Sequence, residues 1–132
     1  MNRPLPTPTA ESRPFWEGCA AGELRYQRCG HCGRTQLIPR ALCANCQHDH
    51  LHWLVSRGLG RILSFTVVHR APSAAFKDAV PYVIAIVDMD EGFRLMVNVE
   101  EGAGKALSIG QPVRIRYRAL DGATLPQAEI LE

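Results

Sequence analysis

The sequence contains two closely spaced cysteine pairs, Cys29-Gly-His-Cys32 and Cys43-Ala-Asn-Cys46, with ten residues between them. Two residues between two cysteines allow one tight turn to direct both sulfur atoms towards the same point. Two such turns on adjacent hairpins supply four thiolates to one tetrahedral site. The spacing therefore predicts a metal site whose ligands are Cys29, Cys32, Cys43 and Cys46.

The ten residues between the pairs are enough for one strand out and one strand back, which is the arrangement of a zinc ribbon. Two disulfides or a redox-active pair would need an oxidising compartment or a thioredoxin-like setting, and neither is visible in the sequence. Zinc is the expected metal, because a closed four-sulfur site without a redox partner usually has a structural role. Iron, bound as in rubredoxin, is the alternative.

Length and composition limit the class of protein. The chain has 132 residues, enough for one domain or two very small ones, and it is 46% hydrophobic and 21% charged, as expected of a folded globular protein. The longest apolar run, Val80 to Val87, is far shorter than the roughly 20 residues that span a bilayer. The N-terminus has no apolar signal-like stretch. We therefore expect a cytoplasmic protein without a membrane partner.

The chain divides by composition into three parts. Residues 1–12 contain Pro4, Pro6 and Pro8 and are expected to be a flexible lead-in. Residues 13–57 are expected to form a helix over Pro14 to Ala21 and then the ribbon, whose flanking strands are Leu24 to Gln27 and Leu51 to Leu54. Gly58 and Gly60 mark a boundary, and residues 58–132 are expected to form a second domain.

The second domain is predicted to be entirely β. Five segments are rich in β-branched residues or alternate apolar with polar ones: Arg61 to His69, Pro81 to Asp88, Phe93 to Val99, Pro112 to Arg118 and Leu125 to Leu131. The second of these is apolar throughout, so we expect burial on both of its faces. A helical turn within Glu101 to Gly110 would complete a small, partly open barrel of the OB type. A β-sandwich is the competing fold.

No catalytic set can be assembled from the sequence. No serine lies in a nucleophile elbow, no carboxylate pair lies in an apolar setting, and no glycine-rich segment has the form of a phosphate loop. Cys19 is expected to be a small buried residue. His48, His50 and His52 recur with period two, so we expect them on one solvent-facing side of a strand and not as ligands. We expect no catalytic residues and no enzyme activity of the chain alone.

Three arginines, Arg114, Arg116 and Arg118, alternate with apolar residues and should share one face of a strand. They would either bind phosphates, of a nucleic acid or of coenzyme A, or form a solvated face balanced by Asp88, Asp90 or Glu100. The net charge of +2 and the aromatic content of 7% favour the solvated face over a nucleic-acid site.

The order and spacing of several segments resemble a known two-part family, in which a rubredoxin-like zinc ribbon precedes an acyl-CoA-associated OB-fold domain. It was formerly catalogued as a domain of unknown function. The resemblance covers nearly the whole chain and lies in Phe15-Trp16, Gly22-Glu23-Leu24, Arg28 to Gly33, Pro39 to Cys46, Trp53, Gly60 to Pro72, Pro81 to Ala85 and Ile109 to Val113.

This resemblance implies an all-β protein with a short N-terminal helix, a rubredoxin-like zinc ribbon and a five-stranded OB-type barrel. It also implies a non-catalytic accessory subunit that docks on a thiolase-superfamily enzyme, such as a thiolase, acyltransferase or aldolase, and helps to form its acyl-CoA site. His69, Arg70 and Lys77 are the candidate acyl-CoA or partner contacts. The alternatives are a nucleic-acid-binding module and a stand-alone acyl-CoA-binding protein.

Overall fold

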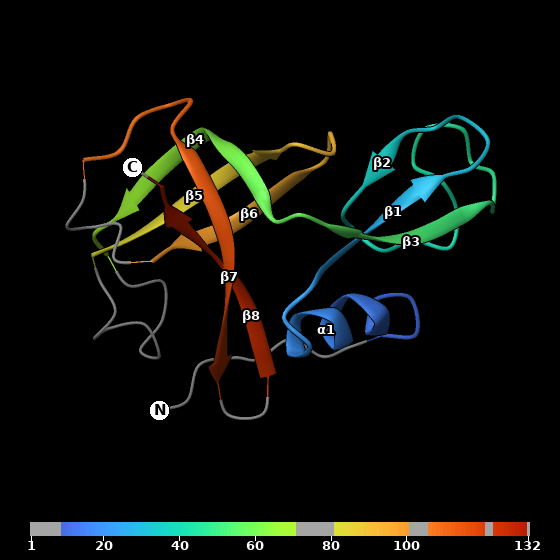
Figure 1. Ribbon diagram of the computed structural model, residues 1–132, viewed down its shortest axis with the longest axis horizontal. Helices are drawn as coiled ribbons and strands as arrows, with labels where there is room; N and C mark the ends of the chain where they lie inside the picture. The colour runs from blue at the N-terminus through green and yellow to red at the C-terminus, as the bar shows by residue number, and fades with distance from the viewer. Residues whose placement is uncertain (1–8, 71–80, 101–105, 121–122, 132) are drawn as a thin grey trace.

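The computed structural model describes residues 9–70, 81–100, 106–120 and 123–131. Within these ranges the chain forms one short helix and eight strands (Figure 1). Their bounds are α1 Arg13–Ala20, β1 Leu24–Cys29, β2 Thr35–Gln36, β3 Leu51–Ser56, β4 Leu59–Val68, β5 Tyr82–Met89, β6 Arg94–Val99, β7 Pro112–Leu120 and β8 Ala123–Ile130. No helix among the described residues is long and apolar enough to cross a bilayer.

The first three strands form a small antiparallel sheet in the order β2-β1-β3. The central strand β1 pairs along its whole length with β3, from Leu24 opposite Ser56 to Cys29 opposite Leu51. On its other edge β1 pairs with the two-residue strand β2. The end of β1 therefore lies beside the start of β3, and the loops that carry the cysteines project from this end of the sheet (Figure 1).

The remaining five strands form a closed barrel in the order β4-β5-β6-β8-β7. All neighbours are antiparallel except β6 and β8, which are parallel. The predicted five-stranded OB-type barrel is confirmed and the sandwich is excluded. The barrel is closed and not partly open, because β7 pairs with β4 through Leu59 to Arg61. The predicted helical turn lies partly outside the described residues.

Strand β5 corrects one expectation. The segment Pro81 to Asp88 was expected to be buried on both faces, but its residues alternate between the barrel interior and the outer surface. Val83 and Val87 are buried, whereas Ile86 is 38% exposed. Among the described residues, no other layer covers the outer face at this position of the closed barrel. The apolar residues on the outer face therefore form a surface feature.

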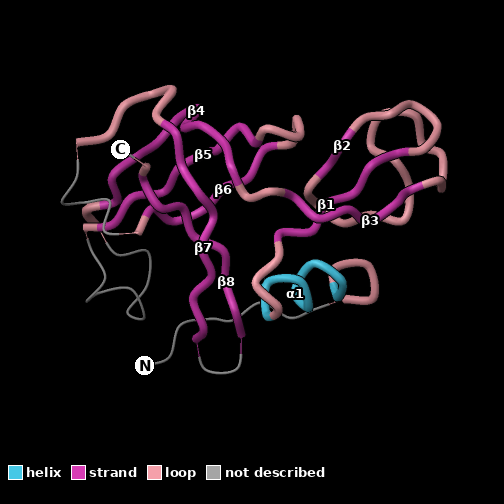
Figure 2. The backbone as a smooth tube through the Cα atoms, in the orientation of Figure 1, coloured by secondary structure: helices cyan, strands magenta, loops and turns pink. Residues whose placement is uncertain are grey.

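Helix α1 lies at the junction of the ribbon and the barrel (Figures 1 and 2). A proline in the first turn favours its start, and it ends before Gly22, whose φ of +79° suits a residue without a Cβ atom. Phe15 and Cys19 point into a core that also contains Leu24 of the ribbon and Ile115 of the barrel. The helix, ribbon and barrel thus share one hydrophobic core.

The ribbon and the barrel are also joined by Glu91 in the turn between β5 and β6. Its carboxylate accepts hydrogen bonds from the hydroxyl of Ser56 at 2.7 Å and from the backbone N–H of Arg57 at 2.9 Å. Its carbonyl oxygen accepts a hydrogen bond from the Thr35 hydroxyl at 3.3 Å. Nearby, Tyr26 of β1 stacks on Phe93, with ring centroids 4.7 Å apart. These contacts link the sheet of the ribbon to one end of the barrel.

Candidate functional site

The four predicted cysteine ligands meet at the end of the ribbon. Their sulfur atoms all lie within 4.8 Å of one another. The distances are 3.5 Å between Cys29 and Cys46 and 3.6 Å between Cys32 and Cys43. A tetrahedron with metal–sulfur bonds of about 2.3 Å has sulfur atoms about 3.8 Å apart. The four side chains therefore fit a tetrahedral metal ion, and all four are free thiols and not disulfides.

Backbone N–H groups donate hydrogen bonds to two of the four sulfur atoms. In each cysteine pair the first sulfur accepts two N–H bonds: Cys29 from His31 at 3.3 Å and Cys32 at 3.4 Å, and Cys43 from Asn45 at 3.4 Å and Cys46 at 3.5 Å. The N–H of Cys46, followed by that of Asn45, lowers the pKa of the Cys43 thiol to about 6. The turns therefore stabilise a thiolate before any metal is bound.

The fourth sulfur shows why the site needs a cation. The backbone N–H of His48 acts to lower the pKa of the Cys46 thiol. Loss of water and the three neighbouring sulfur atoms outweigh this effect and raise the pKa to about 12. Thiolates this close together repel one another, and a divalent cation removes this repulsion. The arrangement can therefore hold a metal ion, and such a closed four-sulfur site supports structure.

The second cysteine turn is tied to β1 by two glutamines. Gln27 is buried, and its Oε1 accepts hydrogen bonds from Gln36 Nε2 at 2.7 Å and from the N–H of Arg40 at 3.0 Å. Gln27 Nε2 donates to the Arg40 carbonyl at 3.0 Å. Gln36 Oε1 in turn accepts a hydrogen bond from the N–H of Ala44 at 2.9 Å. Sequence reasoning missed this network, because neither glutamine lies in a recognisable motif.

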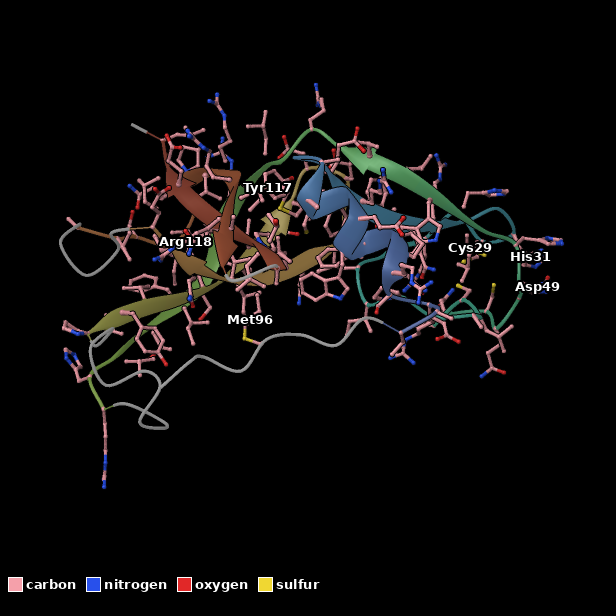
Figure 3. The ribbon with its side chains drawn as sticks, turned by 90° about the horizontal axis from the view of Figure 1, so that it is seen from below. Cys29, His31, Asp49, Met96, Tyr117 and Arg118 are labelled. Atoms are coloured by element: carbon pink, nitrogen blue, oxygen red, sulfur yellow. The ribbon has the colours of Figure 1, made fainter. Side chains whose placement is uncertain are left out.

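The histidines near the site are exposed and are not part of the four-sulfur cluster. Only His52 lies in a strand, so the expected strand face shared with His48 and His50 is not formed. The ring of His48 instead stacks on that of His31, with centroids 3.7 Å apart. In Figure 3 His31 lies with Cys29 at the tip of the ribbon, far from Met96 and Arg118 in the barrel.

Cys19 is buried, as expected, and burial raises the pKa of its thiol to about 11. A thiol in this environment is protonated near neutral pH and is a poor nucleophile.

The three candidate acyl-CoA or partner contacts are only partly described. His69 and Arg70 follow directly after β4 and are exposed. Lys77 lies outside the described residues. The role of these residues stays a prediction.

The arginine stripe has the expected geometry. Arg114, Arg116 and Arg118 are exposed, whereas the intervening Val113 and Ile115 are buried. Arg116 forms an ion pair of 2.7 Å with Glu129 on β8. The predicted partners Asp88, Asp90 and Glu100 form no ion pair with the stripe among the described residues. The register of β7 and β8 explains this correction, since it places Glu129 directly beside the stripe.

A second feature is an apolar groove of about 520 Å³ between α1, the loop after β2 and the outer face of the barrel. We call it the α1 groove. Its described lining is Ser12, Phe15, Trp16, Leu37, Ile38, Pro39, Ile84, Leu95, Met96, Val97, Asn98, Leu125, Pro126 and Gln127. His69 and Arg70 do not line it. The sequence analysis did not predict this groove, although the large side chains of Phe15 and Trp16 in so short a helix could have indicated it.

Comparisons with known proteins agree with both parts of the structure. Residues 16–50 match the family model of the ChsH2 rubredoxin-like zinc ribbon domain, and residues 53–118 match that of the ChsH2 C-terminal OB-fold domain. A DUF35 domain-containing scaffold protein of Methanothermobacter thermautotrophicus is 34% identical over 72% of this chain and 71% of its own length.

A longer relative is the probable enoyl-CoA hydratase alpha subunit of Thermomonospora curvata, which is 31% identical over 94% of this chain. This chain spans 39% of the length of that subunit. Among solved structures, the Ltp2-ChsH2(DUF35) aldolase superposes with a TM-score of 0.82 at 29% identity, covering 96% of this chain and 98% of that one. The chain thus matches the models of both parts in the same order, and it belongs to the ChsH2-type DUF35 family of zinc ribbon and OB-fold proteins.

Proposed function

We propose that the chain is a non-catalytic subunit of a thiolase-superfamily acyl-CoA enzyme, on which it docks and whose acyl-CoA site it helps to form. The observation that carries the proposal is the match over 96% of the chain to a protein in the Ltp2-ChsH2(DUF35) aldolase. The names of the hydratase subunit and the scaffold protein also describe parts of larger assemblies. These relatives support an enzyme partner for this chain.

Two buried ionisable side chains are unsuited to acid–base catalysis. Burial raises the pKa of Cys19 to about 11 and that of Tyr117 to about 12. General acid–base catalysis needs a group whose pKa lies near the working pH. Neither side chain meets this condition, and the proposal assigns the reacting groups to the partner.

In this proposal the metal is zinc, held by Cys29, Cys32, Cys43 and Cys46, and it stabilises the ribbon without taking part in the reaction. His69, Arg70 and Lys77 are the proposed contacts to acyl-CoA or to the partner. Arginine and lysine side chains suit the phosphates of coenzyme A, and arginine can bind a phosphate through two hydrogen bonds. The division into residues 13–57 and 58–132, after a lead-in of 1–12, is also part of the proposal.

The proposal is tested by co-expressing the chain with thiolase-superfamily enzymes from the same genome. We expect one of these enzymes to elute together with the chain and its acyl-CoA reaction to be lost when this chain is omitted. Separate elution, with activity that does not depend on this chain, would overturn the proposal. Calorimetry of the isolated chain with an acyl-CoA provides the comparison with a stand-alone binding protein, which would bind tightly without a partner.

The candidate contacts are tested within the same complex. Replacing both His69 and Arg70 with alanine should raise the KM for acyl-CoA or weaken the complex, because both side chains are exposed and available to a ligand. Arg57→Ala is a matched control on an exposed arginine elsewhere. Unchanged KM and unchanged assembly in the double variant would contradict the assignment of these two residues.

A further inference from the structure

The lips of the α1 groove are apolar and open to solvent. Met96 on β6 is 69% exposed and Ile38 in the loop after β2 is 66% exposed. Ile86, which lies directly opposite Met96 on β5, extends the same surface. Figure 3 shows Met96 pointing away from the barrel. A contiguous apolar surface of this kind on a soluble protein marks a site of interaction.

The groove is preformed by parts that are distant in the sequence. Trp16 comes from α1, Pro39 from the ribbon, and Leu125 from the last strand of the barrel. The buried amide of Gln27 holds the ribbon wall in place through its two hydrogen bonds to the backbone of Arg40. A groove that exists before binding costs little ordering entropy when a partner enters it.

The charged residues beside the groove are mainly basic. Arg13 follows the lining residue Ser12, Arg40 follows Pro39, and Arg118 lies directly opposite Leu125 in the β7–β8 register. All three are exposed and form no ion pair with any described residue.

Three carboxylates also lie near the groove. Glu11 precedes Ser12, Glu17 follows Trp16, and Asp88 lies directly opposite Arg94 on the neighbouring strand and so offsets that arginine. The three arginines beside the groove outnumber Glu11 and Glu17, which leaves a small excess of positive charge around an apolar centre. Complementary charge of this kind selects partners and orients them as they approach.

We infer that the α1 groove receives a segment of the partner enzyme that presents apolar side chains flanked by carboxylates. This inference rests on the proposed function and names the surface through which it acts. The apolar side chains would pack between Trp16 and Met96, and the carboxylates would face Arg13, Arg40 and Arg118. Protein interfaces commonly combine an apolar centre with a charged, solvent-accessible rim.

The test uses the complex of the full chain with the thiolase-superfamily enzyme that elutes together with it. Met96→Glu and Ile38→Glu each place a carboxylate on a lip of the groove. Each should weaken the complex by about tenfold or more, the scale of a central interface residue. Both positions are largely exposed, so the fold should tolerate the change. Circular dichroism and metal content show whether each variant is folded. If one variant does not fold, the other carries the test.

The matched control is Ile109→Glu. Ile109 is 72% exposed and does not line the groove, so the same chemical change there should leave the affinity unaltered. The charged rim is tested by replacing Arg13 and Arg40 together with alanine. This should weaken the complex by about three- to tenfold at low ionic strength and reduce the dependence of its affinity on salt.

The outcomes separate the two proposals. A stable wild-type complex that persists with both glutamate variants would overturn the docking inference and leave the proposed function in place. Absence of any wild-type complex would overturn both. If the isolated chain is dimeric by light scattering and Met96→Glu makes it monomeric, the occupant is a second copy of this chain, and the inference is wrong.

Discussion

Single residues carry most of what makes the metal site possible. Cys29 and Cys43 occupy the same position in their respective turns, and each accepts two backbone N–H bonds. Cys46 lies among three other sulfur atoms, and its pKa is about 12. The turns thus supply part of the stabilisation of four thiolates, and a cation must supply the rest.

Acidification is expected to release the metal. Protons compete with the metal for thiolates, so the bound form is favoured at higher pH and is lost as the pH falls. The pKa of Cys43 is lowered to about 6, so this thiolate takes up a proton only when the pH falls towards that value. A chromogenic chelator should detect metal release between about pH 8 and about pH 5. The Cys43→Ser variant should release metal at a higher pH than the wild type, and equal release curves would contradict this assignment.

Gln27 is expected to be important for stability. Its replacement by leucine leaves the Gln36 amide and the N–H and C=O groups of Arg40 without their buried partner. Unsatisfied buried groups cost about 1–3 kcal/mol each, so we expect the free energy of unfolding to fall by about 2–4 kcal/mol, as measured in urea. Gln111→Leu is the control, because it removes only one exposed hydrogen bond from the backbone N–H of Ser108. It should change the free energy of unfolding by about 0.5 kcal/mol or less. Equal effects of the two substitutions would contradict this role.

At the scale of elements, the turn between β5 and β6 connects the barrel to the ribbon. Glu91 in this turn reaches the last residue of β3 and the residue that follows it. Gly60 shows how closely the strands approach beside this turn, because a Cβ atom there would lie 2.7 Å from the Asp88 carbonyl oxygen. The junction is therefore held by specific contacts and not only by the shared core.

Glu91→Ala is expected to loosen this junction. It removes the acceptor of the Ser56 hydroxyl and of the Arg57 N–H, so the free energy of unfolding should fall by about 1–3 kcal/mol. Amide exchange at Arg57 should become faster. Asp90→Ala in the same turn is the control, because the Asp90 side chain is exposed and makes no hydrogen bond to a described residue. The role of Glu91 would be contradicted if Asp90→Ala had the same effects.

Strand β5 marks a limit of prediction at this scale. Its position follows from its β-branched composition, but an apolar run cannot indicate which of its faces is covered. Burial on both faces requires a second layer, and in the closed barrel the outer side of Ile84 and Ile86 contributes to the open surface instead. The register of the β5–β6 hairpin brings Met96 opposite Ile86, and the exposure of this pair follows from the closure of the barrel.

The whole molecule combines a ribbon that carries a four-cysteine cluster with a barrel that has its own closed sheet. The core of the barrel contains Val83, Val87 and Val113, all buried and all from strands that pair with other barrel strands. The ribbon contributes mainly one short sheet and the cysteine loops. Removal of the metal should therefore affect the two parts unequally.

Chelation is expected to unfold the ribbon before the barrel. Because a structural zinc ion contributes on the order of 10 kcal/mol to the folding of a small ribbon, its loss should expose residues 24–56 to hydrogen exchange. Peptides from β5, β6 and β7 should stay protected. The groove wall at Leu37 to Pro39 belongs to the ribbon, so binding of the partner enzyme should weaken as well. Equal loss of protection in both parts would show that they unfold as one unit.

The amino-acid sequence by itself determined the four cysteines that can hold a metal ion, the strands and the order of the two parts. These depend on local properties: a two-residue turn sets the spacing of two sulfur atoms, and alternation or β-branching sets a strand. Only the tertiary structure decided the closure of the barrel, the pairing of Arg116 with Glu129, the hydrogen bonds of Glu91 to the end of β3 and the α1 groove. Each of these joins residues far apart in the chain, and their distance depends on the packing of the whole core and not on any local pattern.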